Sequence, residues 1–453
     1  MRPTVFRPSV ISSPVICVAV CLALSAGART RSRYGGALRM ETQSDPWRVP
    51  DGVARKLVFD GLTCVDNAGV VQPGLAIRWE SQNDDHRWQF WLRPGVRFHD
   101  GVALTAAAVA VSLSQSCVKQ CPWTNLSAVG NSLVFTGDSA MPQLPAELAR
   151  SMYFIARQHE GAEPSGTGPF RVSKVTNGVV FLRANNDYWQ GRPFLDTVQV
   201  EGKRTLRDQW LDLSVGRADI VEVPAELLHQ AAQDRLMVLA SHPTDLLVLS
   251  VSSKGALRDD QLRQAIALAV DRSALFNVIF QKEGEPTGSL LPADFTGYAF
   301  LFPTERDITR ARSYRAGAGT APLVLTIDNP DTSTQLVAER IVLNLREVGL
   351  NAQVRPVSSQ ASADLVLKRI HLEAADATAG LDEMFEDFGQ KTPEETGTPD
   401  GRYRAEHDFL KTYQAIPLLY LPRALAYGER VRGLRLSADG TPMIADVSID
   451  GAK

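Results

Sequence analysis

The sequence predicts a protein of the α/β class. Residues 323–327 form a short apolar run that is typical of a buried strand, and residues 351–357 are a second strand candidate. The segment between them repeats apolar residues at the spacing of one helix face, at Val337, Ile341, Leu345 and Val348. Gly349 then supplies a helix end. A strand, a helix and a strand in this order make a β-α-β unit, the building block of α/β folds.

More strands are expected in the first quarter of the chain. Residues 37–41 indicate a short strand, and a proline-containing turn follows it. From residue 87 to 92 apolar side chains alternate at Trp88, Phe90 and Leu92, which predicts a strand with one buried face. The Arg-Pro-Gly turn at 93–95 follows, and the alternation resumes at Val96 and Phe98. We therefore expect a hairpin over residues 87–98.

Two regions predict helices that begin at a capping residue. Thr105 fits an N-cap, with Val109 and Leu113 on one face of the helix behind it. Between residues 259 and 280 apolar residues recur at helical spacing, and Asp271 fits the cap of a second, short helix.

Two stretches predict irregular structure instead. Residues 316–321 and 380–399 are rich in small, polar and loop-forming residues, and we expect loops there.

The first 28 residues are typical of a secretory signal peptide. Arg2 and Arg7 precede an apolar run at 15–25, and the small residues 26–28 follow it. Spanning a bilayer takes about 20 apolar residues, more than this run offers. We expect cleavage near Ala28 and a soluble, exported chain, periplasmic or otherwise outside the cytoplasm.

A lipid anchor is not expected, because the residues before the two cysteines of this segment, Cys17 and Cys21, are the large Ile16 and Val20. Removing residues 1–28 leaves 46 basic and 51 acidic residues, a formal charge of −5. With no basic stripe in the sequence, nucleic acid is not an expected partner.

Three cysteines remain after such a cleavage. Cys117 and Cys121 are four positions apart and, in an oxidising compartment, would close a disulfide at a helix end; two unpaired thiols are the alternative. Cys64 would then be free. No metal is expected, since no His lies near the cysteine pair and the seven His are scattered.

Five separated blocks of residues carry more specific information. The most distinctive is Phe-Trp-Leu-Arg-Pro-Gly-Val-Arg-Phe-His-Asp-Gly at 90–101, followed by Leu-Thr-Ala at 104–106. The other blocks lie at 59–62 with 71–76 and 79–80, at 166–170 with 182–183, 185–189 and 193–196, at 262–266 with 269–272, and at 416–420 with 431–434. In this order they resemble the extracellular solute-binding proteins of family 5, which serve dipeptide, oligopeptide and nickel importers.

The resemblance implies a bilobal periplasmic-binding-protein fold of type II. Two mixed-sheet lobes would lie around a cleft, joined by hinge strands, and close on a ligand. It further implies a receptor without enzymatic activity and without a cofactor. This receptor would capture a small ligand, a peptide for preference, and deliver it to the permease subunits of an ABC importer. A monomer is expected.

The chain departs from the family pattern in two places. Ala107 and Ala108 stand where the family carries acids after the capping Thr, so the helix loses a favourable interaction worth about 1 kcal/mol. The stretch 117–163 is short beside the family's second subdomain, so a reduced extra subdomain is expected in the first lobe.

The resemblance places ligand contacts only roughly. In peptide binders of this family a carboxylate takes the amino end of the ligand and a basic residue takes its carboxyl end. Applied to this chain, eight residues are candidates for ligand binding: Asp45, Trp47, Trp123, Ser250, Ser252, Asp382, Glu383 and Arg423. No catalytic residue is expected.

The resemblance also divides the chain. We expect a signal peptide at 1–28, the first lobe at 29–60, 166–248 and 426–453, the reduced subdomain at 61–165, and the second lobe at 249–425.

Two other functions are weighed against transport. A degenerate family member acting as a sensor or scaffold is consistent with the short 117–163 stretch. A secreted hydrolase is less consistent, because the sequence contains neither a G-x-S-x-G nor an H-E-x-x-H motif.

Overall fold

The computed structural model describes residues 34–451, with gaps at 50–51, 67–68, 118–120, 298–300, 303, 316–321, 357–362 and 375. The expected signal segment 1–28 and the expected loop 316–321 lie outside the described residues. Among the described residues, none of the helices combines the length and the apolar character that crossing a membrane requires.

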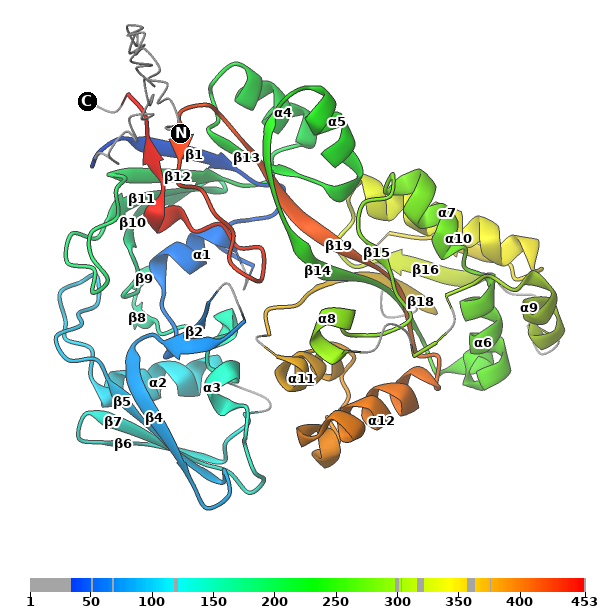
Figure 1. Cartoon of the computed structure of the whole chain (residues 1–453), viewed down its shortest axis with the longest axis horizontal. Coiled ribbons are helices and arrows are strands. Elements are labelled where there is room, and N and C mark those ends of the chain that lie inside the picture. Colours follow the sequence, from blue (N-terminus) through cyan, green and yellow to red (C-terminus); the bar gives the residue numbers. More distant parts are fainter. Residues whose placement is uncertain are drawn as a thin grey trace, which may run out of the picture. The chain divides into compact units, whose positions relative to one another are not determined.

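The main feature of the fold is a mixed sheet of 11 strands (Figure 1). The strands follow the order β10 (Phe170–Thr176), β11 (Val179–Ala184), β12 (Thr197–Glu201), β1 (Ala37–Glu41), β13 (Ile220–Val223), β19 (Ala415–Tyr427), β14 (Met237–Val251), β18 (Leu365–His371), β16 (Leu323–Ile327) and β17 (Ala352–Val354), and β15 (Glu285–Pro286) pairs with β19. Parallel and antiparallel neighbours both occur, so the predicted α/β class is confirmed.

The half of the sheet from β10 to β13 belongs to what we call the first lobe. β1 is parallel to β12 and β13, whereas β10, β11 and β12 are antiparallel neighbours. The apolar side chains of these strands form one buried cluster with the helix α1 (Val53–Val58). The helices α4 (Leu206–Ser214) and α5 (Leu228–Gln233) pack on β13 and β14.

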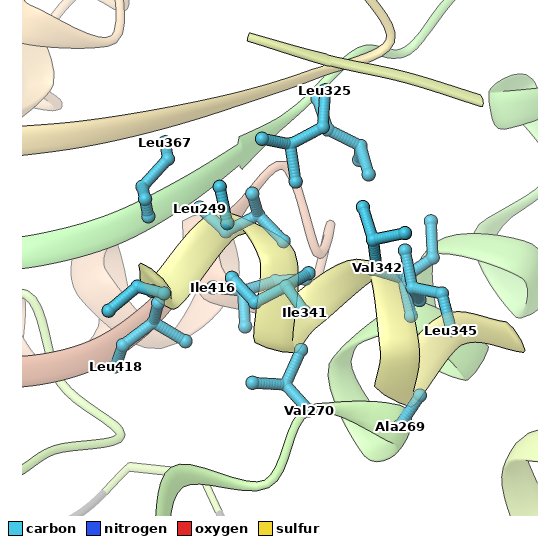
Figure 2. Close-up of a cluster of buried hydrophobic side chains, with 14 of the residues drawn as sticks. Leu249, Ala269, Val270, Leu325, Ile341, Val342, Leu345, Leu367, Ile416 and Leu418 are labelled. Atoms are coloured by element: carbon cyan, nitrogen blue, oxygen red, sulfur yellow. The ribbon is translucent and has the colours of Figure 1, made fainter. Parts of the chain in front are cut away.

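The other half of the sheet, from the second half of β14 to β17, belongs to the second lobe. β16 is parallel to both β17 and β18, and α10 (Thr332–Glu347) connects β16 to β17, so the predicted β-α-β unit is confirmed. Figure 2 shows Ile341, Val342 and Leu345 of α10 packed toward the strand residues of the sheet. Burying each such side chain contributes roughly 1.5–3 kcal/mol.

Both ends of α10 have a local cause. Asp331 accepts a hydrogen bond from the Thr334 backbone N–H, and the Thr334 hydroxyl accepts one from the Asp331 N–H, which makes a capping box. Gly349 follows the last turn with a φ of 84°, a conformation that glycine adopts without strain.

The long strands β14 and β19 run antiparallel and take part in both lobes (Figure 1). Residues 237–240 pair with 424–427 beside β13, and residues 245–251 pair with 415–421 beside β18. Between these segments the register shifts, and Pro243 lies opposite Pro422. Because proline has no N–H, the hydrogen-bond ladder weakens where the two lobes join.

A smaller antiparallel sheet forms a subdomain of the first lobe. Its order is β4 (Ala76–Gln82), β5 (Arg87–Leu92), β7 (Ser132–Thr136) and β6 (Asn125–Val129), and α2 (Ala106–Ser116) packs on it. Thr105 caps α2 as predicted, its hydroxyl accepting from the Ala108 N–H at 3.2 Å. Cys117 at the end of α2 is joined to Cys121 in a disulfide, and Cys64 is a free, exposed thiol.

The motif blocks meet around the buried carboxylate of Asp60. Thr167, Tyr188 and Trp189, which belong to another block, all donate hydrogen bonds to it. A Cβ at Gly166 would lie 1.9 Å from the Val58 carbonyl oxygen, so the backbones approach too closely for any other residue. The residues of these motifs therefore hold two segments of the first lobe in contact.

Further helices and pairs of short strands complete the fold. The helices are α3 (Leu144–Glu147), α6 (Asp260–Ala269), α7 (Arg272–Ala274), α8 (Ala293–Thr296), α9 (Ile308–Tyr314), α11 (Ala377–Asp387) and α12 (Pro399–Leu410). Two-stranded pairs are formed by β2 (Thr63–Val65) with β3 (Val71–Pro73), β8 (Arg157–His159) with β9 (Ala162–Ser165), and β20 (Val431–Arg432) with β21 (Ser448–Ile449). Asp271 caps α7 as predicted.

Two local predictions are wrong. Residues 87–92 form β5, but Val96 and Phe98 do not pair with it: β5 lies between β4 and β7, and the returning segment makes only a bridge between Arg97 and Ala103. Both edges of β5 are thus already paired with other strands.

The second prediction, a loop over residues 380–399, is wrong only at its ends, since residues 388–398 contain neither an α-helix nor a strand. Residues 380–387 continue α11, which Asp376 caps by accepting from the N–H groups of Thr378 and Ala379, and α12 begins at Pro399. Gly380 lies inside α11 because the helix packs tightly: a Cβ there would be 3.0 Å from a Leu291 methyl group.

Candidate functional site

The two lobes contact each other through a group of charged side chains, which we call the inter-lobe cluster. Its members lie on α1, on the segment after α3, on both long strands, at the end of β18, on α11 and in the loop 437–441: Lys56, Arg150, Ser151, Asp245, His371, Glu373, Glu383, Arg423 and Asp439.

The ammonium group of Lys56 lies at the centre of the cluster. It donates to Asp439 Oδ2 and Thr441 Oγ1, both at 2.7 Å, and it lies 3.0 Å from Glu373 Oε1. Burial lowers the pKa of Lys56, but the carboxylates of Asp439 and Glu373 outweigh it and raise the pKa above its ordinary value. Since α1 belongs to the first lobe and Glu373 follows β18, this contact joins the lobes.

Glu373 has a second partner from the first lobe. Its carboxylate accepts from the Ser151 backbone N–H at 3.1 Å and from the Ser151 hydroxyl at 2.8 Å. Burial raises the pKa of Glu373, yet Lys56, His371 and Ser151 together lower it to about 2. The group is therefore ionised across the physiological range.

His371 connects the centre of the cluster to the long strands. Its Nδ1 lies 2.8 Å from Asp245 Oδ1, and its Nε2 lies 3.9 Å from Asp439 Oδ2, which is an ion-pair distance but too long for a hydrogen bond. Burial and the nearby Arg423 lower the pKa of His371, but Asp245 and Asp439 raise it to about 9. His371 is thus a cation at neutral pH.

A second group of charges surrounds Arg150. Its guanidinium lies 2.8 Å from Glu147, 3.3 Å from Glu386 and 4.0 Å from Glu383. Burial raises the pKa of Glu147 and raises that of Glu383 to about 7. Carboxylates outnumber the cation here, so this part of the cluster favours an additional positive group.

Three residues of the cluster have the atoms to hold a metal ion. One ligand atom each of His371, Glu373 and Asp439 lies within 4.8 Å of the other two. The Lys56 ammonium, however, already contacts both carboxylates. A metal ion would have to displace this lysine and the proton of His371.

Two of the eight ligand-binding candidates lie in the cluster. Glu383 accepts from the backbone N–H groups of Glu373 and Ala374, and Arg423 donates to Asp245 at 2.9 Å. Asp382 is the neighbour of Glu383 on α11, and burial raises its pKa to about 6.

The other five candidates lie elsewhere. Asp45 accepts from the N–H groups of Trp47 and Arg48, and Trp47 is 9% exposed and donates to Glu163 at 2.7 Å. Trp123 is 6% exposed in the core of the subdomain. Ser250 lies on β14, and Ser252 follows it and accepts from the Lys254 N–H. Their role in ligand binding stays a prediction.

Seven members of the cluster were missed from the sequence: Lys56, Arg150, Ser151, Asp245, His371, Glu373 and Asp439. The available signal was weak. A lysine directly before the apolar residues 57–59, and a His-Leu-Glu sequence at the end of β18, indicate buried charge but not its partners.

The fold thus consists of two α/β lobes that share a pair of long strands and meet over charged side chains. The sequence profile of the bacterial extracellular solute-binding proteins, family 5, matches residues 70–391. The chain belongs to this family. Because its members are non-catalytic solute-binding proteins, the expectation that the chain is not an enzyme is confirmed.

The curated relatives share about a quarter of the aligned residues with this chain. The chain is 24% identical over 245 residues to the nickel-binding protein NikA of Staphylococcus aureus, an alignment that covers 51% of this chain and 49% of the relative. It is 25% identical over 328 residues to the probable D,D-dipeptide-binding periplasmic protein DdpA of Escherichia coli, covering 66% and 63%. The chain thus spans about half to two thirds of the length of these two relatives.

Solved structures support the fold over a larger share of the chain. S. aureus NikA in complex with Ni(L-His)2 has a TM-score of 0.79 at 18% identity and covers 91% of this chain and 100% of its own. The oligopeptide-binding protein AppA of Bacillus subtilis in complex with a nonapeptide has a TM-score of 0.76 at 17% identity, covering 92% and 100%. The predicted bilobal fold is confirmed.

Proposed function

We propose that this chain is the exported receptor of an ABC importer and that it captures a small peptide between its two lobes. The family assignment supports a solute-binding role in import. The observation that carries the proposal is the inter-lobe cluster, in which the side chains of one lobe bind those of the other directly.

The polar nature of these contacts suits a protein that opens and closes. When the lobes part, Lys56 and Glu373 exchange each other for water, as do Arg150 and Glu386, whereas an apolar interface would lose its hydrophobic stabilisation. The irregular pairing around Pro243 and Pro422 provides a place where the shared strands bend.

The cluster also has the charges that a peptide needs. A peptide carries an ammonium group and a carboxylate, and the cluster offers acids beside Lys56 and around Arg150 as well as the two cations themselves. The ammonium of a ligand would take the place that Lys56 fills beside Glu373. Glu383 and Arg423 stay candidates for such contacts, as do Asp45, Trp47, Trp123, Ser250, Ser252 and Asp382.

We include the expected domain boundaries in the proposal. The first lobe at 29–60, 166–248 and 426–453, the subdomain at 61–165 and the second lobe at 249–425 are supported by three apolar clusters. One cluster lies within residues 62–155, one draws on residues 38–59, 170–220 and 425–449, and one consists mainly of residues 247–421 together with Ala225. A further cluster joins Ala146 of the subdomain to residues 246–420.

Thermal-shift and calorimetric measurements with dipeptides, oligopeptides and Ni(L-His)2 would test the proposal. We expect peptides to raise the melting temperature, since a ligand at 100 times its Kd stabilises by about 2.7 kcal/mol. If the nickel complex alone raises the melting temperature, the proposed ligand class becomes a metal chelate instead of a peptide. No stabilisation by any of the three classes would contradict transport and favour a sensor or scaffold.

A further inference from the structure

The second lobe contains a cavity that the proposed function does not use. Its volume is about 320 Å³, and it lies between α6, α9, the end of α12 and the first residues of β19. Leu268, Phe302, Leu410 and Ile416 give it an apolar lining, and Arg272 and Arg310 also line it. None of these residues belongs to the inter-lobe cluster.

Arg272 is the unusual member of this lining. Its side chain is 5% exposed, and its Nε donates to the Pro417 carbonyl oxygen at 2.7 Å. Within the part of the chain that the structure describes, no carboxylate forms an ion pair with this guanidinium. The acid next to it in sequence, Asp271, lies 3.8 Å from Arg306 instead.

The electrostatics agree with this geometry. Burial lowers the pKa of Arg272 to about 10, and no neighbouring acid opposes the effect. A buried cation is expensive unless an anion pairs with it, because the protein interior solvates charge poorly. The fourth motif block ends at Arg272, and neither the packing of the lobes nor the inter-lobe cluster explains why a charge is placed there.

The rest of the lining complements the buried arginine. Arg310 is exposed on α9, where its Nε donates to the Tyr314 hydroxyl at 3.2 Å, and Gln264 and Tyr413 add polar groups to the wall. The lining therefore combines hydrogen-bond donors and positive charge with apolar side chains. Such a combination selects a ligand with a charged head and a hydrocarbon body.

We propose that this cavity binds an amphipathic anion, a carboxylate carrying a short hydrocarbon chain, with Arg272 pairing the carboxylate. At about 30 Å³ for each water-sized group, the volume accommodates roughly ten heavy atoms. Octanoate, which has a carboxylate and a seven-carbon tail, is a probe of this size.

Isothermal titration calorimetry of the purified full chain with octanoate tests the proposal. We expect saturable, sub-millimolar binding of octanoate, and binding of octylamine that is weaker by about tenfold or more, because the two probes differ mainly in the charge of the head group. The Arg272→Met variant keeps the hydrocarbon stem and removes the charge. It should bind octanoate about tenfold more weakly, and Arg310→Met should bind it about threefold more weakly.

A control variant tests whether binding belongs to this cavity. Arg258→Met removes an exposed cation from the same lobe outside the cavity. It should bind octanoate like the wild type, and a thermal melt of each variant verifies folding. The proposal is overturned if octanoate does not bind, if octylamine binds equally well, if both cavity variants retain full affinity, or if Arg258→Met loses it.

Discussion

Asp245 on β14 and Arg423 on β19 form an ion pair of 2.9 Å at the place where the two long strands lose their regular register. The same Asp245 oxygen lies 2.8 Å from His371 Nδ1. The weakest part of the strand ladder is thus bridged by side chains. This pairing holds the two strands together where the lobes join.

The first prediction concerns Asp245 itself. Replacing it with Asn should destabilise the protein by about 3 kcal/mol, because the largely buried His371 and the partly exposed Arg423 would lose their shared carboxylate. Urea unfolding measures the change. Asp138→Asn, at an exposed position of the subdomain, is the matched control and should stay within about 0.5 kcal/mol of the wild type. Equal effects of the two variants would contradict a structural role of the pair.

The second prediction concerns pH. The pKa of His371 is about 9 in the folded protein, above the value near 6.5 expected in the unfolded chain. The folded state therefore binds the proton more tightly, and this contribution is fully present below about pH 6.5 and is lost as the pH rises toward 9. It amounts to at most about 3 kcal/mol.

Unfolding free energies at about pH 6 and pH 9 check this for the wild type and for His371→Gln. The variant should lose less stability over this interval, since a glutamine does not titrate. If both proteins show the same slope, His371 is not the group responsible.

The third prediction concerns Lys56. The Lys56→Met variant removes the cation between Glu373 and Asp439, which should cost about 3–5 kcal/mol. It also clears the position that a metal ion would need beside His371. We expect Zn²⁺ to raise the melting temperature of Lys56→Met but not that of the wild type.

Lys254→Met, at an exposed position, serves as the control for a lysine lost outside the cluster. Stabilisation of the wild type by Zn²⁺ to the same extent as the variant would show that Lys56 does not keep metal out.

The fourth prediction tests the core of the second lobe. Ile341 is fully buried on α10, whereas Leu343 on the same helix is 48% exposed. Ile341→Ala should destabilise by about 2–5 kcal/mol, because it leaves a cavity against the sheet, and Leu343→Ala should cost less than about 1 kcal/mol. Denaturant unfolding of the two variants provides the comparison, and a larger loss at Leu343 would be incompatible with the packing described.

Local patterns predicted the parts of the fold that local physics determines. The β-α-β unit follows from the apolar spacing around Ile341, and the helix starts follow from Thr105 and Asp271. Gly380 misled the prediction because glycine usually breaks helices. Here the close approach of Leu291 requires it inside α11.

The inter-lobe cluster could not be predicted in the same way. Lys56 and Asp439 are 383 positions apart, and Lys56 and Glu373 are almost as far. Neither contact leaves a periodic signal in the chain, because each depends on how two lobes come together. The two lobes could be predicted from the resemblance to a family, whereas the partners of the charged side chains became known only from the structure.

The position of β19 has a consequence for how the chain is made. This strand ends at residue 427, near the end of the sequence, yet it lies in the middle of the large sheet, between β13 and β14. At about 5–20 residues per second, a ribosome takes on the order of tens of seconds to reach it. Until then the sheet consists of two separate pieces with an open gap, so an incomplete nascent chain cannot lock into its final form.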